Sequence, residues 1–149
     1  MSEQYFHIFT DGSSIKNSPT SSAGWAAYFP TLSKLISYHI IGTNNIAELT
    51  AVKNALHFCK YHLDEIPNNK PIKIYTDSKY VINMLSNGFK SKVNIDLINK
   101  CKYYIQYLAS KNHIVKFSHV SAHTKKKDYY SKCNDLVDKT ARSQAEKQK

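Results

Sequence analysis

Cysteine, glycine and proline are scarce in this chain of 149 residues, and arginine occurs once. The three cysteines, Cys59, Cys101 and Cys133, lie far apart, and none forms a CxxC pair. This pattern supports neither a disulfide framework nor a zinc site, so we expect free thiols. The few glycines and prolines leave no flexible linker between two domains. We therefore expect one domain over residues 1–149.

Long apolar runs are also missing. No stretch approaches the ~18 consecutive apolar residues of a membrane-spanning helix, so we expect no membrane partner. Residues 1–4 have neither the basic nor the apolar region of a secretory signal. The default expectation is an intracellular monomer, in cytoplasm or nucleus, that needs no small-molecule cofactor.

Positive charge is abundant, with 21 Lys and Arg against 11 Asp and Glu and a formal net charge of +10. Such a surface attracts polyanions, above all nucleic acid. All the basic residues except Arg142 are lysines, which act as point charges on phosphates, whereas arginine more often reads base edges. The composition favours backbone binding with little sequence preference, although solubility alone would also explain the charge.

Strand-like and helix-like segments alternate along the chain. The expected strands are Tyr5–Thr10, Ala23–Phe29, Leu32–Ile41, Ile72–Thr76 and Ile114–Val120, and the expected helices are Asn45–His62, Ser78–Ser86, Ile95–Ser110 and Tyr130–Ala145. Asn44 or Asn45 is expected to cap the first helix and Asn94 the third. Residues from about 143 to 149 are expected to form a basic, frayed tail. The order βββαβααβα predicts an α/β fold with one mixed sheet and helices packed on it.

Two aspartates stand at the ends of expected strands in nearly matching contexts, Asp11 in FTDGS and Asp77 in YTDS. If these strands are parallel neighbours, both carboxylates emerge at the same edge of the sheet. Adjacent like charges repel unless a shared proton or a metal neutralises them. Hard oxygen ligands of this kind suit Mg²⁺ or Mn²⁺.

Four segments, taken in order, resemble a known family. They are Thr10 to Ser13 (TDGS), Thr43 to Leu49 (TNNIAEL), Tyr75 to Val81 (YTDSKYV), and His123 followed by Asn134 to Asp138 (NDLVD). Their order and separation over nearly the whole chain resemble type 1 ribonucleases H, including the ribonuclease H domains of reverse transcriptases. The resemblance implies a ribonuclease H-like fold with a mixed five-stranded sheet. A separate hybrid-binding module is not expected, because the first strand begins at about Tyr5.

The resemblance also implies four acids as metal ligands and catalytic residues: Asp11, Glu48, Asp77 and Asp138. Taken singly, a helix-dipole role would explain Glu48, and a solvated surface charge would explain Asp138. Together they form an acidic site in a chain whose other seven acids oppose 21 bases. The implied reaction is hydrolysis of the RNA strand of an RNA–DNA hybrid by two Mg²⁺ ions roughly 3.5–4 Å apart. Mn²⁺ is an expected substitute, and the products carry 5′-phosphate and 3′-hydroxyl ends.

Further site residues are expected on the same basis. His123 matches the family's mobile histidine, whose imidazole suits proton transfer, and an exposed bystander is the alternative. The hybrid is expected to be recognised by its shape and its 2′-hydroxyls in the minor groove. The residues expected to contact it are Asn17, Thr43, Asn44, Asn45, Lys90, Lys92 and Asn134. Ordinary capping and turn formation are the alternative roles of the asparagines at the first helix.

Two other functions remain open at this level. One is a structure-specific DNA nuclease or resolvase on the same architecture, against which the TNN segment before Glu48 argues, since hybrid-cutting members carry it. The other is a nucleic-acid-binding module without catalysis. The four acids argue against this module, because a pure binder gains nothing from negative charge facing phosphate.

Three segments depart from the family pattern. Residues 16–22 stand in place of a glycine-rich turn, and residues 87–93 form a connection shorter than the basic protrusion of many cellular members. The loop 124–130 is longer than usual and carries Lys125 to Lys127. We therefore expect hybrid binding to depend on Lys90 and Lys92 or on a partner, with a contribution from this loop.

Overall fold

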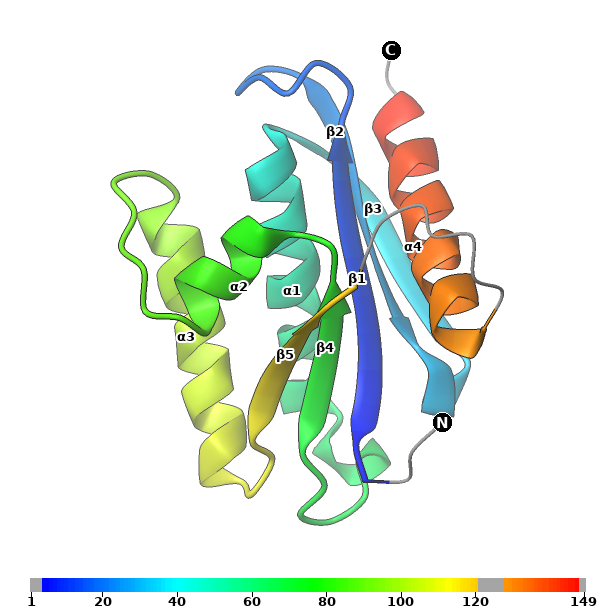
Figure 1. The fold of residues 1–149 in the computed structure, drawn as a ribbon, viewed down its shortest axis with the longest axis vertical. Coiled ribbons are helices and arrows are strands. Elements are labelled where there is room, and N and C mark those ends of the chain that lie inside the picture. Colours follow the sequence, from blue (N-terminus) through cyan, green and yellow to red (C-terminus); the bar gives the residue numbers. More distant parts are fainter. Residues whose placement is uncertain (1–3, 121–127, 148–149) are drawn as a thin grey trace.

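The computed structural model describes residues 4–120 and 128–147, and its elements follow the expected order (Figure 1). The strands are β1 (Phe6–Ser14), β2 (Ser22–Phe29), β3 (Lys34–Ile41), β4 (Ile72–Thr76) and β5 (Val115–His119). The helices are α1 (Asn44–Tyr61), α2 (Lys79–Leu85), α3 (Ile95–Ser110) and α4 (Tyr129–Glu146), with two 3-10 turns, η1 (Pro30–Leu32) and η2 (Leu63–Glu65). The order βββαβααβα is confirmed, and the two 3-10 turns are additions to it.

The five strands form one mixed sheet in the order β3-β2-β1-β4-β5. The first three strands pair antiparallel, while β4 pairs parallel with β1 and β5 pairs parallel with β4. Helices connect the parallel strands, as crossover connections require. The mixed five-stranded sheet and the parallel neighbours β1 and β4 are therefore confirmed.

Alternate side chains of the strands supply two hydrophobic cores, because successive residues of a strand point to opposite faces. In β1, Phe6 and Ile8 pack in the cluster that includes α1 and α3, whereas Phe9 packs in the cluster that includes α4. Figure 1 accordingly shows α1 and α3 on one side of the sheet and α4 on the other. Each large apolar side chain buried in this way contributes about 1.5–3 kcal/mol, which holds the helices in place. None of the helices within residues 4–120 and 128–147 is long and apolar enough to cross a membrane.

The first strand is longer than its sequence suggested. β1 runs past Asp11 to Ser14, so the strand end expected at Thr10 is wrong. Parallel pairing with β4 ends at Phe9, but antiparallel pairing with β2 continues to Ser14 opposite Ala23. Asp and Gly have low strand propensity, and pairing with a neighbouring strand overrides it here.

The expected helix caps also need correction. Thr43, rather than Asn44 or Asn45, caps α1, because its Oγ1 accepts a hydrogen bond from the N–H of Ile46 at 3.2 Å. Asn94 precedes α3 with a left-handed backbone (φ 60°), and its side chain makes no capping bond. Its amide instead donates to the Tyr80 hydroxyl at 3.1 Å.

The start of the third strand and the C-terminal tail also differ from expectation. The strand expected from residue 32 begins at Lys34, because η1 occupies the preceding residues. The frayed tail expected from residue 143 is helical to Glu146. This end of α4 is held on the sheet: Gln144 donates to the Ser37 hydroxyl at 2.8 Å, the Ser22 hydroxyl donates to the carbonyl oxygen of Ala145, and the Ala145 side chain is buried.

Close packing of α4 on β2 depends on Gly24, where a Cβ would lie 2.4 Å from the carbonyl oxygen of Ala141 and 2.6 Å from the backbone nitrogen of Ala145. We expect Gly24→Ala to lower the free energy of unfolding by about 3 kcal/mol, because backbone atoms yield less than side chains. Urea denaturation measures this loss. Gly88→Ala is the control: its Cβ meets nothing within 4 Å, so only its left-handed backbone (φ 72°) opposes the change, at about 1 kcal/mol. Equal losses for the two variants would contradict the close contact.

Candidate active site

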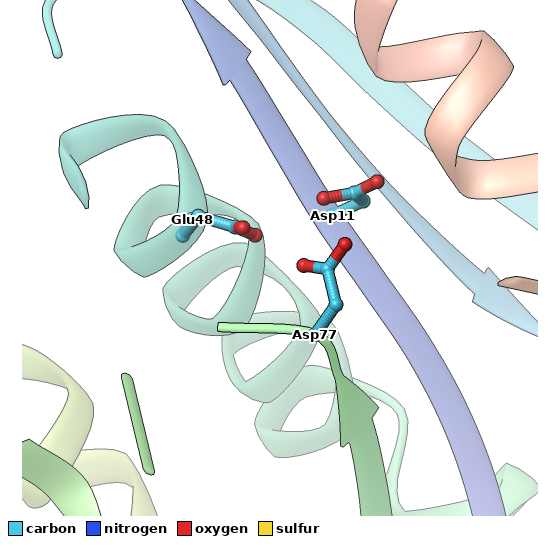
Figure 2. Close-up of side chains that lie close together, drawn as sticks. All are labelled: Asp11, Glu48 and Asp77. Carbon is cyan, nitrogen blue, oxygen red and sulfur yellow. The ribbon is translucent and has the colours of Figure 1, made fainter. Parts of the chain in front are cut away.

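Three carboxylates converge where β1, β4 and α1 meet. Asp11 comes from the middle of β1, Asp77 directly follows β4, and Glu48 comes from the second turn of α1. One oxygen from each carboxylate lies within 4.8 Å of the other two. Figure 2 shows the three side chains directed toward a common point.

The strand register explains why the two aspartates meet. The parallel pairing ends with Phe9 opposite Tyr75, and two more residues of the same register bring Asp77 level with Asp11. The chain then turns away, because Ser78 caps α2 by accepting a hydrogen bond from the N–H of Val81 at 3.1 Å. The juxtaposition expected from the matching sequence contexts is confirmed, although Asp11 lies within its strand rather than at its end.

Gly12 allows the third carboxylate to approach. A Cβ at Gly12 would lie 2.3 Å from the carbonyl carbon of Ala47 and 2.4 Å from the backbone nitrogen of Glu48. Backbone contact this close leaves no room for a side chain, so Gly12 lets α1 carry Glu48 to Asp11. The Gly12 N–H also donates to Oδ1 of Asp11 at 2.8 Å. Sequence reasoning included Gly12 only as part of the TDGS segment and missed this role.

Asp138 is the fourth acid, and it reaches the site from α4 on the other side of the sheet. It lies close enough to Asp11 for its negative charge, and a hydrogen bond to the protonated Asp11 carboxyl, to raise the pKa of Asp11. Nε of Arg142, one helical turn later, lies 3.3 Å from Oδ1 of Asp138. The side chain of Asp138 is only 25% exposed, so a freely solvated surface charge does not describe it. Sequence reasoning missed this ion pair, for which the i, i+4 spacing was an available signal.

Burial and mutual repulsion change the proton affinity of two of these acids. Burial raises the pKa of Asp11 to about 8; the charges of Asp77 and Asp138 add to the rise, and the Gly12 N–H opposes it. The pKa of Glu48 is raised well above its usual value, first by burial and then by the charges of Asp11 and Asp77. The helix-dipole explanation of Glu48 is wrong, since the first turn of α1 contains no acid.

The donor set fits a divalent cation. Oε1 of Glu48 is buried and has no hydrogen-bond partner within the described part of the chain. A buried carboxylate oxygen without a partner costs free energy, and a cation that binds it removes this cost. Carboxylate oxygens are the ligands that Mg²⁺ and Mn²⁺ prefer. Asp11, Glu48 and Asp77 are therefore a candidate metal centre.

The start of α1 and the loop after β1 are hydrogen bonded to each other. Oδ1 of Asn44 accepts from the N–H of Ser14 at 2.7 Å, and the Asn44 N–H donates to Oδ1 of Asn17 at 3.0 Å. Thr43 caps the helix here, and Asn45 follows with an exposed side chain. The structure thus brings Asn17, Thr43, Asn44 and Asn45 together, one turn before Glu48.

The other expected site residues are more dispersed. Lys90 and Lys92 are exposed between α2 and α3. Lys92 lines a shallow hollow of about 530 Å³ that also includes Ile46 of α1, whereas Lys90 does not line it. Asn134 is buried one turn before Asp138 on α4, and its Oδ1 has no hydrogen-bond partner among the described residues. His123 lies outside the described residues, as do Lys125 to Lys127.

Comparisons with known sequences agree with this arrangement. The RNase H family model matches residues 3–146. Ribonuclease H of Tropheryma whipplei is 47% identical over 77 residues, which cover 52% of this chain and 43% of that protein. The match thus spans less than half the length of that relative. Ribonuclease H of Chlorobium luteolum is 28% identical over 144 residues, which cover 87% of this chain and 90% of the relative.

Solved structures show the same fold. LC11-RNase H1, solved in complex with an RNA/DNA hybrid, superimposes with a TM-score of 0.69 at 19% identity, covering 95% of this chain and 97% of that one. The family match extends over nearly the whole chain, and the four motifs that suggested the resemblance lie within it. The chain therefore belongs to the ribonuclease H family.

Proposed function

We propose that this chain is an endonuclease that hydrolyses the RNA strand of RNA–DNA hybrids. The observation that carries the proposal is the convergence of Asp11, Glu48 and Asp77, with a buried Glu48 oxygen that lacks a partner among the described residues. Family membership and the net charge of +10 support it, because a strongly basic surface attracts the phosphate backbone.

In this proposal Asp11, Glu48, Asp77 and Asp138 hold two Mg²⁺ ions, for which Mn²⁺ substitutes. When bound, such ions would supply Lewis-acid activation of a water and charge stabilisation for the leaving 3′ oxygen, and the products would carry 5′-phosphate and 3′-hydroxyl ends. Arg142 is a positioning residue, since its contact with Asp138 orients that carboxylate. His123 is the proposed proton carrier, for which an imidazole is suited.

The proposed hybrid-binding residues lie around the start of α1, on the connection between α2 and α3, and on α4. Asn17, Thr43, Asn44 and Asn45 sit at the N-terminus of α1, where backbone N–H groups favour a phosphate. Lys92 borders the hollow next to this terminus, and Lys90 extends the basic surface. We assign Asn134 to the same interface, because its carbonyl oxygen has no partner among the residues described.

Metal-dependent strand choice tests the proposal. The substrates are four end-labelled duplexes: an RNA–DNA hybrid, RNA–RNA, DNA–DNA, and DNA with one embedded ribonucleotide. We expect only the RNA strand of the hybrid to be cut efficiently, with Mg²⁺ or Mn²⁺ present, and activity to vanish in excess chelator. Cleavage of plain or branched DNA would assign the site to a DNA nuclease or resolvase instead. Hybrid binding without cleavage would assign the chain to the non-catalytic modules.

A further inference from the structure

Aromatic and basic side chains gather where the C-terminal half of α1 meets α3. We call this surface the tyrosine–lysine patch; its residues are Lys60, Tyr61, Lys100, Tyr103, Tyr104 and Tyr107. Nζ of Lys60 lies 4.6–6.0 Å from the centroids of all four tyrosine rings. It also donates a hydrogen bond to the Tyr103 hydroxyl at 3.0 Å.

Core packing accounts for only part of this patch. Ile98, Cys101 and Leu108 are the buried residues of α3, and Tyr104 and Tyr107 pack, partly buried, against the same core. Tyr61 is 62% exposed and Tyr103 is 53% exposed. Tyr103 also lines a shallow hollow of about 580 Å³ with Asp96, Asn99, Lys100 and Tyr104. Large rings are therefore presented to solvent beside an open depression.

The charge around the patch is positive. The two helices carry four lysines, at positions 53, 60, 100 and 102, and their acids are Asp96 and the active-site residue Glu48. Flat aromatic faces beside cationic groups are the combination that binds unpaired nucleic acid, because bases stack on the rings and lysines contact the phosphates. An acidic peptide would match the lysines but would make no comparable use of stacked rings.

We propose that the tyrosine–lysine patch binds single-stranded nucleic acid, namely the unpaired extension of a duplex that lies at the acidic site. Twelve residues of α1 separate Glu48 from Lys60, which is about 18 Å along a helix. An extension of about five nucleotides, at 3.4 Å each, spans this distance. Binding of single-stranded nucleic acid at the patch does not depend on the proposed nuclease function, whereas the link between the patch and a bound duplex rests on that function.

Binding of a fluorescein-labelled dodecathymidylate to the metal-free protein, followed by fluorescence anisotropy, tests the single-strand site. We expect the double variant Tyr61→Ala/Tyr103→Ala to raise the Kd at least about tenfold, because each lost stacking contact weakens binding severalfold or more. The double variant should leave the salt dependence of the Kd unchanged. Lys100→Gln should lower the slope of the logarithm of affinity against the logarithm of salt concentration by about 0.7, because one phosphate contact is lost.

Matched variants separate stacking from general effects. Tyr38→Ala removes a tyrosine that is 70% exposed on β3, outside the patch, and should leave the Kd unchanged. Tyr103→Phe keeps the ring and should bind nearly as well as the wild type, while Tyr103→Leu keeps the apolar bulk, preserves folding and should bind weakly. Thermal unfolding followed by circular dichroism verifies that each variant is folded.

Three results would overturn the proposal. The wild type does not bind the oligonucleotide, or the double variant and Tyr38→Ala have equal Kd values, or the double variant loses binding to a labelled oligoglutamate while it still binds the oligonucleotide. The last result would assign the patch to an acidic protein partner. The assay contains neither metal nor duplex, so its failure leaves the nuclease proposal untouched. Conversely, oligonucleotide binding without hybrid cleavage would refute the nuclease proposal alone.

Discussion

Replacing Asp11 by asparagine is expected to reduce the rate of hybrid cleavage by at least about 100- to 1,000-fold. Asp11 is buried at the centre of the acidic cluster, and Asp77, Glu48 and Asp138 all interact with it. Asparagine keeps the shape and an oxygen that the Gly12 N–H can reach, but it removes the negative charge that a divalent cation requires. Single-turnover cleavage at saturating Mg²⁺ measures the rate of the cleavage step separately from hybrid binding.

The matched control for this variant is Asp64→Asn, which changes an exposed aspartate in η2 far from the acidic site in the fold. It should cleave at the wild-type rate. Metal-free hybrid binding by Asp11→Asn should be as tight as that of the wild type, and tighter above about pH 8, where the ionised Asp11 of the wild type repels phosphate. Wild-type cleavage by Asp11→Asn would refute the metal mechanism.

The stability of the metal-free protein is expected to fall as the pH rises from about 4 to about 8. The folded state holds the Asp11 proton up to a pKa of about 8, whereas an unperturbed aspartate releases it near 3.8. Between these values the unfolded chain binds fewer protons than the folded one, so each pH unit costs about 1.4 kcal/mol. Below about pH 4 both states are protonated and the penalty is absent; above about pH 8 it is fully present. The raised pKa of Glu48 acts in the same direction.

Urea denaturation in chelator, at several pH values across this window, measures the effect. Mg²⁺ should restore stability at high pH, because it binds the ionised carboxylates of the folded state only. Asp11→Asn should be more stable than the wild type in chelator near pH 8 and should show a flatter pH dependence, while Asp64→Asn should follow the wild type. If the free energy of unfolding of the metal-free wild type rose with pH relative to that of Asp11→Asn, the raised pKa of Asp11 would be contradicted.

The two predictions connect stability with activity at the same residues. The acids that repel one another in the metal-free protein are those proposed to hold the cations. A variant that relieves the repulsion should therefore gain stability and lose cleavage. Such a trade-off is expected where a functional site keeps like charges together.

The elements that sequence reasoning located best are those with a strong local pattern. Helix α3 has the predicted bounds, because its apolar residues recur at helical spacing over several turns. The continuation of β1 beyond Asp11 was missed, because Asp and Gly are poor strand formers and only β2 reveals the pairing. The Thr43 cap was missed for a similar reason, since three consecutive polar residues can each begin the helix and the backbone conformation selects one.

The sequence by itself determined the order of the elements, the net positive charge and, through four ordered motifs, the family, and it supplied the four acids proposed as metal ligands. These properties are carried by neighbouring residues and by composition, so they can be read without coordinates. Only the tertiary structure decided that three carboxylate oxygens lie within 4.8 Å of one another and that the backbone of α1 packs directly against Gly12. It also decided that the tyrosines of α3 surround Lys60 of α1. Each of these depends on strand register and on how closely a helix approaches its neighbour, which are set by contacts between residues distant in sequence.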